Sequence, residues 1–241
     1  PGIEPEGRVE ITYEPVREKL DDRHTVTLRR PKYTLKANSV YGQAHPETLL
    51  SPRLAQPLVG LGLLESVEEK TILALADPDD GNKDGISGRA SYVLNPENQQ
   101  TELGRFGWKA SQPSLRLQTA IAFLRDIGIT NSIYPDEDFT TAQAKIIKPS
   151  THGNLPEIDD SKLNRVVTYL RTLAPPAQRK PKAEKVTRGE ELFTHAGCAK
   201  CHTPTLKTGP NAPIDELKNQ VIRPYTDLLL HDMGDALSDG I

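Results

Sequence analysis

Cys198-Ala199-Lys200-Cys201-His202 is the stretch from which the rest of this chain can be understood. Two thiols two residues apart, followed at once by an imidazole, have the spacing of a c-type haem attachment site. On one helical turn, each cysteine can add to a haem vinyl group as a thioether, and the next side chain then lies under the iron. The motif therefore predicts a covalent haem c on Cys198 and Cys201, with His202 as the proximal iron ligand.

Three other uses of the two thiols compete with haem. A thioredoxin-like redox pair would sit in a βαβ setting, and the flanking sequence has none. A zinc site would need a second pair of ligands, and no second CxxC or HxxxH follows. Structural thiols or a disulfide would leave a haem-free protein. These are the only cysteines among 241 residues, and the adjacent histidine favours haem.

The sequence before the motif predicts a short helix that ends at the attachment site. Thr187 and Glu190 have capping-box spacing, which predicts a helix start at Thr187. Leu192 and Phe193 then give the helix an apolar side, and Gly197 is a residue at which such a helix ends.

Further elements follow from hydrophobic periodicity. Residues 8–36 alternate apolar and polar side chains around a polar turn, which predicts a β-hairpin. Apolar residues at helical spacing predict helices over 52–67, 68–76, 113–127 and 160–173. Gly60 and Gly62 lie inside the first of these helices, where small residues permit close packing.

Composition excludes some classes of function. The net charge is −3, and lysine and arginine are scattered, so a nucleic-acid partner is not expected. No apolar run approaches the ~18 residues that a membrane-spanning helix needs. Covalent haem attachment predicts a location outside the cytoplasm, in a bacterial periplasm.

Several stretches together resemble the bacterial di-haem oxidoreductases, which are relatives of di-haem cytochrome c peroxidases and of MauG. The resemblance implies a haem enzyme in which one haem accepts electrons from a small donor protein and the other reduces peroxide or oxidises a substrate. The stretches that carry it are Ser51-Pro52-Arg53-Leu54-Ala55, Gly60-Leu61-Gly62-Leu63-Leu64-Glu65, Asp84-Gly85-Ile86-Ser87-Gly88-Arg89, Gly104-Arg105-Phe106-Gly107-Trp108-Lys109-Ala110, Cys198 to His202, and Pro224-Tyr225-Thr226-Asp227-Leu228-Leu229-Leu230-His231-Asp232-Met233-Gly234.

The resemblance also implies a fold and a domain plan. We expect a mainly α protein made of cytochrome c-like domains with a small β-hairpin elaboration. Residues 1–175 would form a first cytochrome domain, 176–186 a linker, and 187–241 the start of a second domain with the CxxCH. Because the family carries two CxxCH motifs, we expect the first to precede Pro1 and the second domain to continue past Ile241.

Met233 and His231 compete as the second axial ligand of the haem iron. In an extended segment the two side chains share one face, so spacing alone does not choose between them. Met233 is favoured because methionine with histidine is a common ligand pair in electron-transfer c-haems.

Asp80, Asn82 and Asp84 follow the spacing of a calcium-binding loop, with Gly85 at the sharp turn. Position 12 of an EF-hand loop would be Ser91 rather than glutamate, so this is not an EF-hand. A solvated Asp/Gly-rich turn fits the residues equally well. The calcium ion that related di-haem enzymes hold favours a metal here.

Four more residues are weaker candidates. By the resemblance, Trp108 could relay electrons between haems, although a packing role is the usual one for a lone tryptophan. Arg105 and Lys109 could pair with haem propionates, and His45 could be a distal ligand of the first haem.

Two functions of different class remain open from the sequence. One is a peroxidase-like oxidoreductase that uses c-type haem, and the other is a non-enzymatic electron carrier whose irons are closed by axial ligands. A haem-free chain whose CxxC forms a disulfide or binds a metal is the third alternative.

Overall fold

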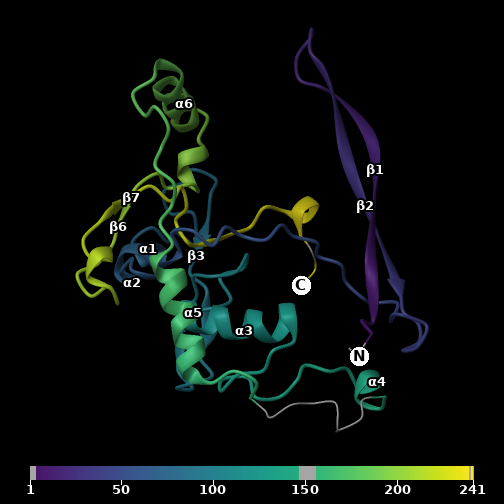
Figure 1. Cartoon of the computed structure of the whole chain (residues 1–241). Coiled ribbons are helices and arrows are strands. Elements are labelled where there is room, and N and C mark those ends of the chain that lie inside the picture. Colours follow the sequence, from purple (N-terminus) through teal and green to yellow (C-terminus); the bar gives the residue numbers. More distant parts are fainter. Residues whose placement is uncertain (1–3, 147–155, 239, 241) are drawn as a thin grey trace. The chain divides into compact units, whose positions relative to one another are not determined.

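The computed structural model describes residues 4–146, 156–238 and 240. The chain divides into two compact units. Unit 1 contains residues 1–54, 139–152 and 235–241, and unit 2 contains residues 55–138 and 153–234. The elements, labelled in Figure 1 where there is room, are β1 (Gly7–Lys19), β2 (Thr25–Ala37), α1 (Leu61–Glu65), α2 (Glu69–Leu73), β3 (Gly88–Arg89), β4 (Tyr92–Leu94), β5 (Thr101–Leu103), α3 (Leu115–Ile127), α4 (Thr141–Ala144), α5 (Asp160–Thr172), α6 (Glu184–His195), β6 (Leu206–Lys207), β7 (Val221–Ile222) and β8 (Leu230–His231), with 3-10 turns η2 (Cys198–Lys200), η3 (Asp215–Leu217) and η4 (Asp235–Leu237).

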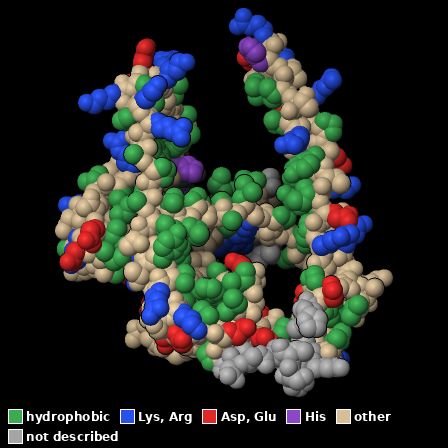
Figure 2. Space-filling model, viewed as in Figure 1, with side chains coloured by type: hydrophobic (Ala, Val, Ile, Leu, Met, Phe, Trp, Pro, Cys, Tyr) green, Lys and Arg blue, Asp and Glu red, His purple; other side chains and the backbone are tan. Residues whose placement is uncertain are grey.

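Unit 1 is built around the hairpin of β1 and β2, which the alternating sequence predicted. The strands pair antiparallel over their whole length, and Figure 1 shows them as a long two-stranded ribbon. Ile11 opposes Tyr33, so apolar side chains share one face, and hydrophobic side chains follow the ribbon in Figure 2. On the opposite face, Lys36 lies 3.8 Å from Glu10, and their charges keep that face polar.

Unit 2 contains two hydrophobic clusters that meet at α1. Leu64 of α1 packs against both clusters, so this short helix joins them. The first cluster combines residues before and after the linker region: Val67, Ile72, Leu103, Leu206, Ile222 and Leu228. The second cluster is formed by Phe106, Leu115, Ala120, Leu163 and Val167 from α3, α5 and the loop before α3.

A half-buried ion pair fixes α1 against α3 and α5. The Arg171 Nε donates to Glu65 Oε2 at 2.6 Å, and its Nη2 donates to Oε1 at 3.2 Å. Glu65 Oε1 also accepts the backbone N–H of Leu115 at 2.8 Å, in the first turn of α3. A carboxylate at a helix N-terminus satisfies a backbone donor that otherwise has no partner within the helix.

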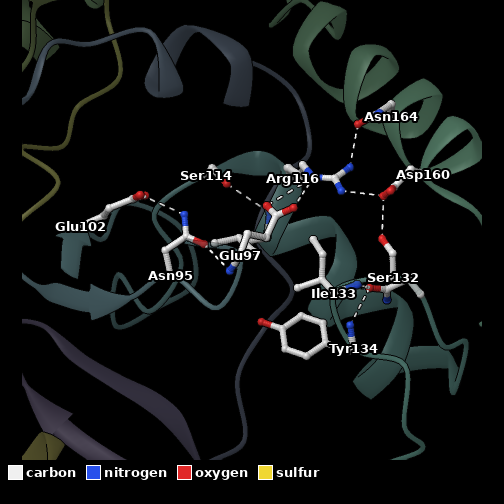
Figure 3. Close-up of polar contacts among 12 residues, drawn as sticks. Asn95, Glu97, Glu102, Ser114, Arg116, Ser132, Ile133, Tyr134, Asp160 and Asn164 are labelled. Carbon is white, nitrogen blue, oxygen red and sulfur yellow. Dashed lines mark hydrogen bonds and ion pairs between the residues drawn. The ribbon is translucent and has the colours of Figure 1, made fainter. Parts of the chain in front are cut away.

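A second polar network ties the start of α5 to α3, as Figure 3 shows. The Arg116 guanidinium donates to Asp160 at 2.6 Å, to Asn164 at 2.7 Å and to Glu97 at 3.0 Å. The hydroxyl of Ser132 also donates to Asp160, at 2.6 Å. These hydrogen bonds from Arg116 and Ser132 lower the pKa of Asp160. The network therefore holds the α5 N-terminus in place while the apolar face of α5 packs on α3.

Gly62 confirms the expected close packing of glycine in α1. A Cβ at this position would lie 2.2 Å from the carbonyl oxygen of Arg171 and 2.7 Å from its Cα. Both atoms belong to the backbone of α5, so neither can move aside without shifting the helix. Glycine is therefore required for α1 and α5 to approach this closely.

Gly62→Ala is accordingly expected to destabilise the protein by about 1–3 kcal/mol through overpacking. Gly189→Ala is the matched control, because Gly189 lies in α6 and an added Cβ there meets no atom within 4 Å. That control should stabilise by about 0.5–1 kcal/mol through helix propensity alone. Chemical denaturation measures both changes, and a stabilising Gly62→Ala would contradict the packing described.

The helix predicted over residues 52–67 is wrong in its first half. Only Leu61–Glu65 is helical; residues 51–58 have no regular secondary structure, and residues 59 and 60 form a turn. Pro57 disfavours helical geometry at the residue before it, and Gly60 has a left-handed φ of 79° at the start of α1. The other predicted helices are present as α2, α3 and α5, with Ser114 and Asp159 capping the last two.

The start predicted for the helix before the CxxCH is also wrong. The N-cap of α6 is Ala183, and Thr187 lies inside the helix, with its hydroxyl donating to the Ala183 carbonyl. The predicted end is right, because Gly197 follows α6 with a left-handed φ of 81°.

The predicted fold class, mainly α with cytochrome c-like domains, is contradicted. Of the residues that the structure describes, 27% are helical and 20% are in strands. The strand content lies mostly in the long hairpin, and the helices are short. The physical reason is the frequency of helix breakers, since the sequence holds 20 prolines and 17 glycines. Apolar residues at helical spacing occur between these breakers without forming long helices.

The linker between two domains that the sequence indicates at residues 176–186 stays a prediction. That segment lies within unit 2, whose first hydrophobic cluster draws on residues from both sides of it. Among the described residues, no helix is both long and apolar enough to cross a membrane.

Candidate functional site

The CxxCH forms a tight turn directly after α6. Gly197 reverses the chain, Cys198–Lys200 form η2, and the backbone N–H of His202 donates to the Cys198 carbonyl at 2.9 Å. Both cysteines are free thiols, with Cys198 exposed and Cys201 half-buried. The turn therefore presents two thiols and an imidazole within five residues, as the motif predicted.

The ring of His202 is oriented by a backbone carbonyl. Its Nδ1 lies 3.0 Å from the carbonyl oxygen of Tyr225, which can only accept a hydrogen bond, so Nδ1 carries the hydrogen. Within the described part of the chain, no hydrogen bond is made to Nε2. The histidine is thereby held as the tautomer whose Nε2 lone pair is available to a metal ion.

Aromatic contacts support this arrangement. Phe193, in the last turn of α6, meets the ring of Tyr225 edge-on at 5.3 Å between centroids. The same phenylalanine lies 6.1 Å from the His202 ring. Tyr225 has a left-handed φ of 53°, an uncommon conformation for a tyrosine. The helix before the motif and the loop after β7 thus meet at His202.

The surroundings of Cys201 disfavour its thiolate form. Burial raises the pKa of Cys201, and the nearby carboxylates of Asp227 and Asp84 raise it further. A redox-active CxxC and a zinc site both depend on thiolates that form easily, usually next to cations. Among the residues described, no group of three or more histidine, cysteine and acidic side chains is placed to hold a metal ion. Two free thiols beside an oriented imidazole fit a haem that is held by thioethers.

The two candidate axial ligands lie in very different surroundings. His231, in β8, uses both ring nitrogens: Nδ1 lies 3.0 Å from the Ser87 carbonyl oxygen, and Nε2 lies 2.7 Å from Asp227 Oδ2. Met233 follows β8, and 64% of its surface is exposed. A thioether in this position is accessible, whereas His231 would have to give up a hydrogen bond to bind iron.

The side-chain oxygens of the predicted calcium loop bind the loop's own backbone. Asp80 Oδ1 accepts the N–H groups of Asp84 and Gly85, and Asn82 Oδ1 also accepts that of Asp84. The side chain of Asp84 lies 3.3 Å from Lys200 Nζ, in the CxxCH turn. The loop as folded is a hydrogen-bonded turn, and calcium at Asp80, Asn82 and Asp84 stays a prediction.

Among the weaker candidates, Arg105 is held by the backbone around the end of α1. Arg105 donates through Nη1 to the carbonyls of Leu64, Glu65 and Val67, where it caps the end of α1. Burial lowers the pKa of this guanidinium. Trp108 is 56% exposed, and Lys109 follows it in the same turn before α3. His45 belongs to unit 1, where its Nδ1 accepts the N–H of Glu47.

Sequence reasoning missed three contributors to the site. Tyr225 acts through its backbone carbonyl, which no side-chain pattern reveals. Asp227 is 4% exposed and binds His231, and the only sequence signal for this pair is an aspartate four residues before a histidine. Lys200 pairs with Asp84, and the CxxCH pattern by itself gives this side chain no role.

Comparison with protein families identifies the class of protein. The family model described as "Di-haem oxidoreductase, putative peroxidase" matches residues 9–241. This chain belongs to that family, and haem is the cofactor that the family implies. Comparisons with curated proteins and with solved structures gave no match.

Proposed function

We propose that this chain binds a c-type haem covalently through Cys198 and Cys201, with His202 as proximal ligand, and that it acts in redox chemistry. The observation that carries the proposal is the hydrogen bond from His202 Nδ1 to the Tyr225 carbonyl, at 3.0 Å. A ligating histidine almost always donates its other ring N–H to a carbonyl or carboxylate, which orients the ring and makes the ligand more basic. Membership of a di-haem family supports the same cofactor.

The residues of this chain would hold and tune the cofactor. Cys198 and Cys201 anchor it, Tyr225 orients His202, and Phe193 supports both rings. When bound, haem supplies one-electron iron chemistry, which no amino-acid side chain provides at this site.

Met233 is our proposed second axial ligand at this haem. Its exposure and the two hydrogen bonds that occupy His231 support the methionine over the histidine. A thioether ligand raises the haem potential, which suits a site that accepts electrons. Met233→Ala should abolish a methionine-ligated spectrum, and an unchanged spectrum would rule the residue out.

The activity we propose for the intact protein is that of a peroxidase-type oxidoreductase in the periplasm. A small electron-donor protein would reduce it, and a peroxide-type substrate would be consumed. Adding hydrogen peroxide to the reduced protein tests this activity. A rapid spectral change with turnover supports the enzyme, whereas an inert spectrum supports a non-enzymatic electron carrier.

Calcium binding at the loop of Asp80, Asn82 and Asp84 is a further part of this proposal. The oxygen-rich spacing supports it, and the same oxygens accept backbone N–H groups of the loop. Calorimetry on the intact protein tests it directly, and an absence of binding heat would remove calcium from the account.

A further inference from the structure

Residues 84–89, with the sequence Asp84-Gly85-Ile86-Ser87-Gly88-Arg89, contact the haem attachment turn on one side. Lys200 Nζ donates to the Asp84 carbonyl oxygen at 3.3 Å and pairs with Asp84 Oδ2, also at 3.3 Å. Lys200 lies between Cys198 and Cys201, so this double contact is made by the turn that would carry the haem.

The same six residues contact β8 on their other side. Gly88 pairs with His231 and Arg89 pairs with Leu230 in a short antiparallel ladder. The Ser87 carbonyl oxygen also lies 3.0 Å from Nδ1 of His231. β8 leads directly into Met233, two residues beyond His231.

Gly88 packs closely against side chains at this second contact. A Cβ there would lie 2.9 Å from Leu229 Cδ1 and 3.2 Å from His231 Cε1. A larger residue at position 88 would therefore require the side chains of Leu229 and His231 to shift.

Hydrogen bonds within residues 84–89, and from them to Asp77 and Pro78, also hold the segment in place. Asp84 Oδ1 accepts the N–H of Ile86 at 3.0 Å, and Arg89 Nη2 donates to the Pro78 carbonyl at 2.8 Å. Gly88 and Asp77 exchange two backbone hydrogen bonds, at 3.0 and 3.2 Å. Because the segment is braced in this way, a shift of the CxxCH turn would also shift β8.

We propose that residues 84–89 form a positioning strap between the haem attachment turn and the strand that leads to Met233. The positioning residues are Asp84 of the strap and Lys200 of the attachment turn. Their ion pair favours the chain conformation in which Met233 can bind the iron. The inference rests on the proposed haem site and on Met233 as its ligand.

The test uses Asp84→Asn and Lys200→Gln in the intact, haem-loaded protein. The readout is the affinity of added imidazole, which competes with Met233 for the iron, together with the haem potential. A partly exposed ion pair is worth about 0.2–1 kcal/mol, so breaking it should raise the affinity for imidazole by about 1.4- to 5-fold in each variant.

The direction of the change in imidazole affinity and in haem potential distinguishes lost positioning of Met233 from an effect of local charge alone. Asp84→Asn removes a negative charge and Lys200→Gln removes a positive one, so a pure charge effect would shift the potential in opposite directions. Loss of the strap would weaken methionine ligation in both variants. The double variant should then show no more than the larger single effect, because both changes break the same link.

Asp79→Asn is the matched control, since it removes a carboxylate from an exposed position of the same loop that makes none of the strap contacts. It should leave the affinity for imidazole unchanged. Unchanged affinity in Asp84→Asn and Lys200→Gln, or changes of opposite sign, would overturn the strap. Absence of covalent haem from the wild-type protein would instead overturn the proposed function.

Discussion

Replacing both Cys198 and Cys201 with alanine is expected to abolish covalent haem attachment at this site. The two thioethers are the only covalent links that the motif offers, and His202 alone would hold the haem by coordination. The intact mass of the protein should therefore fall by one haem relative to wild type, after correction for the two lost sulfur atoms. Denaturing mass spectrometry measures this directly, because haem held only by coordination dissociates.

His202→Ala is the matched comparison for that experiment. It removes the iron ligand but leaves both thiols, so attached haem should persist with a changed spectrum. Cys198 is exposed and Cys201 half-buried, so the double cysteine variant should unfold at nearly the same denaturant concentration as the haem-free wild type. Haem that remains covalently bound after both cysteines are lost would contradict the assignment.

Replacing Glu65 with alanine is expected to destabilise unit 2 more than any other single change considered. The carboxylate is 11% exposed and its partner Arg171 25% exposed, so the substitution leaves a largely buried guanidinium without its ion pair. It also removes the acceptor for the Leu115 N–H at the start of α3. Breaking a fully buried pair costs about 3–5 kcal/mol, and partial exposure reduces the expected cost to about 2–3 kcal/mol.

Thermal unfolding should register this change as a drop in Tm of roughly 5–10 °C. Glu191→Ala provides the control, because Glu191 is an exposed glutamate of α6. Its effect should stay within about 0.5 kcal/mol, as is usual for surface substitutions. Equal Tm values for the Glu65 and Glu191 variants would show that the ion pair does not hold α1, α3 and α5 together.

Local patterns in the sequence predicted several elements well. The alternation around Ile11 predicted the hairpin, and the apolar spacing of residues 113–127 and 160–173 predicted α3 and α5. Glycine at position 62 predicted close packing, because only a missing Cβ permits that approach. The hairpin and the two helices follow from the pattern of nearby residues, and the close approach follows from the size of one residue. Both kinds of information can be read from the sequence.

The fold class was not predictable in the same way. Apolar residues at 52–60 match helical spacing, but Pro57 and the left-handed Gly60 keep that stretch out of a helix. Likewise, the contact of Lys200 with Asp84 spans more than a hundred residues and joins two loops. The orienting carbonyl of Tyr225 has no side-chain signature at all. The motif thus names the residues that we propose to bind haem, whereas the residues that position them required the structure.

The most direct test of the central claim is a reduced pyridine-haemochrome spectrum combined with intact mass, measured on this chain after maturation in a periplasm. We expect a c-type spectrum and an added mass of one haem, attached through Cys198 and Cys201. An unmodified mass without a Soret band would contradict covalent haem attachment at this site.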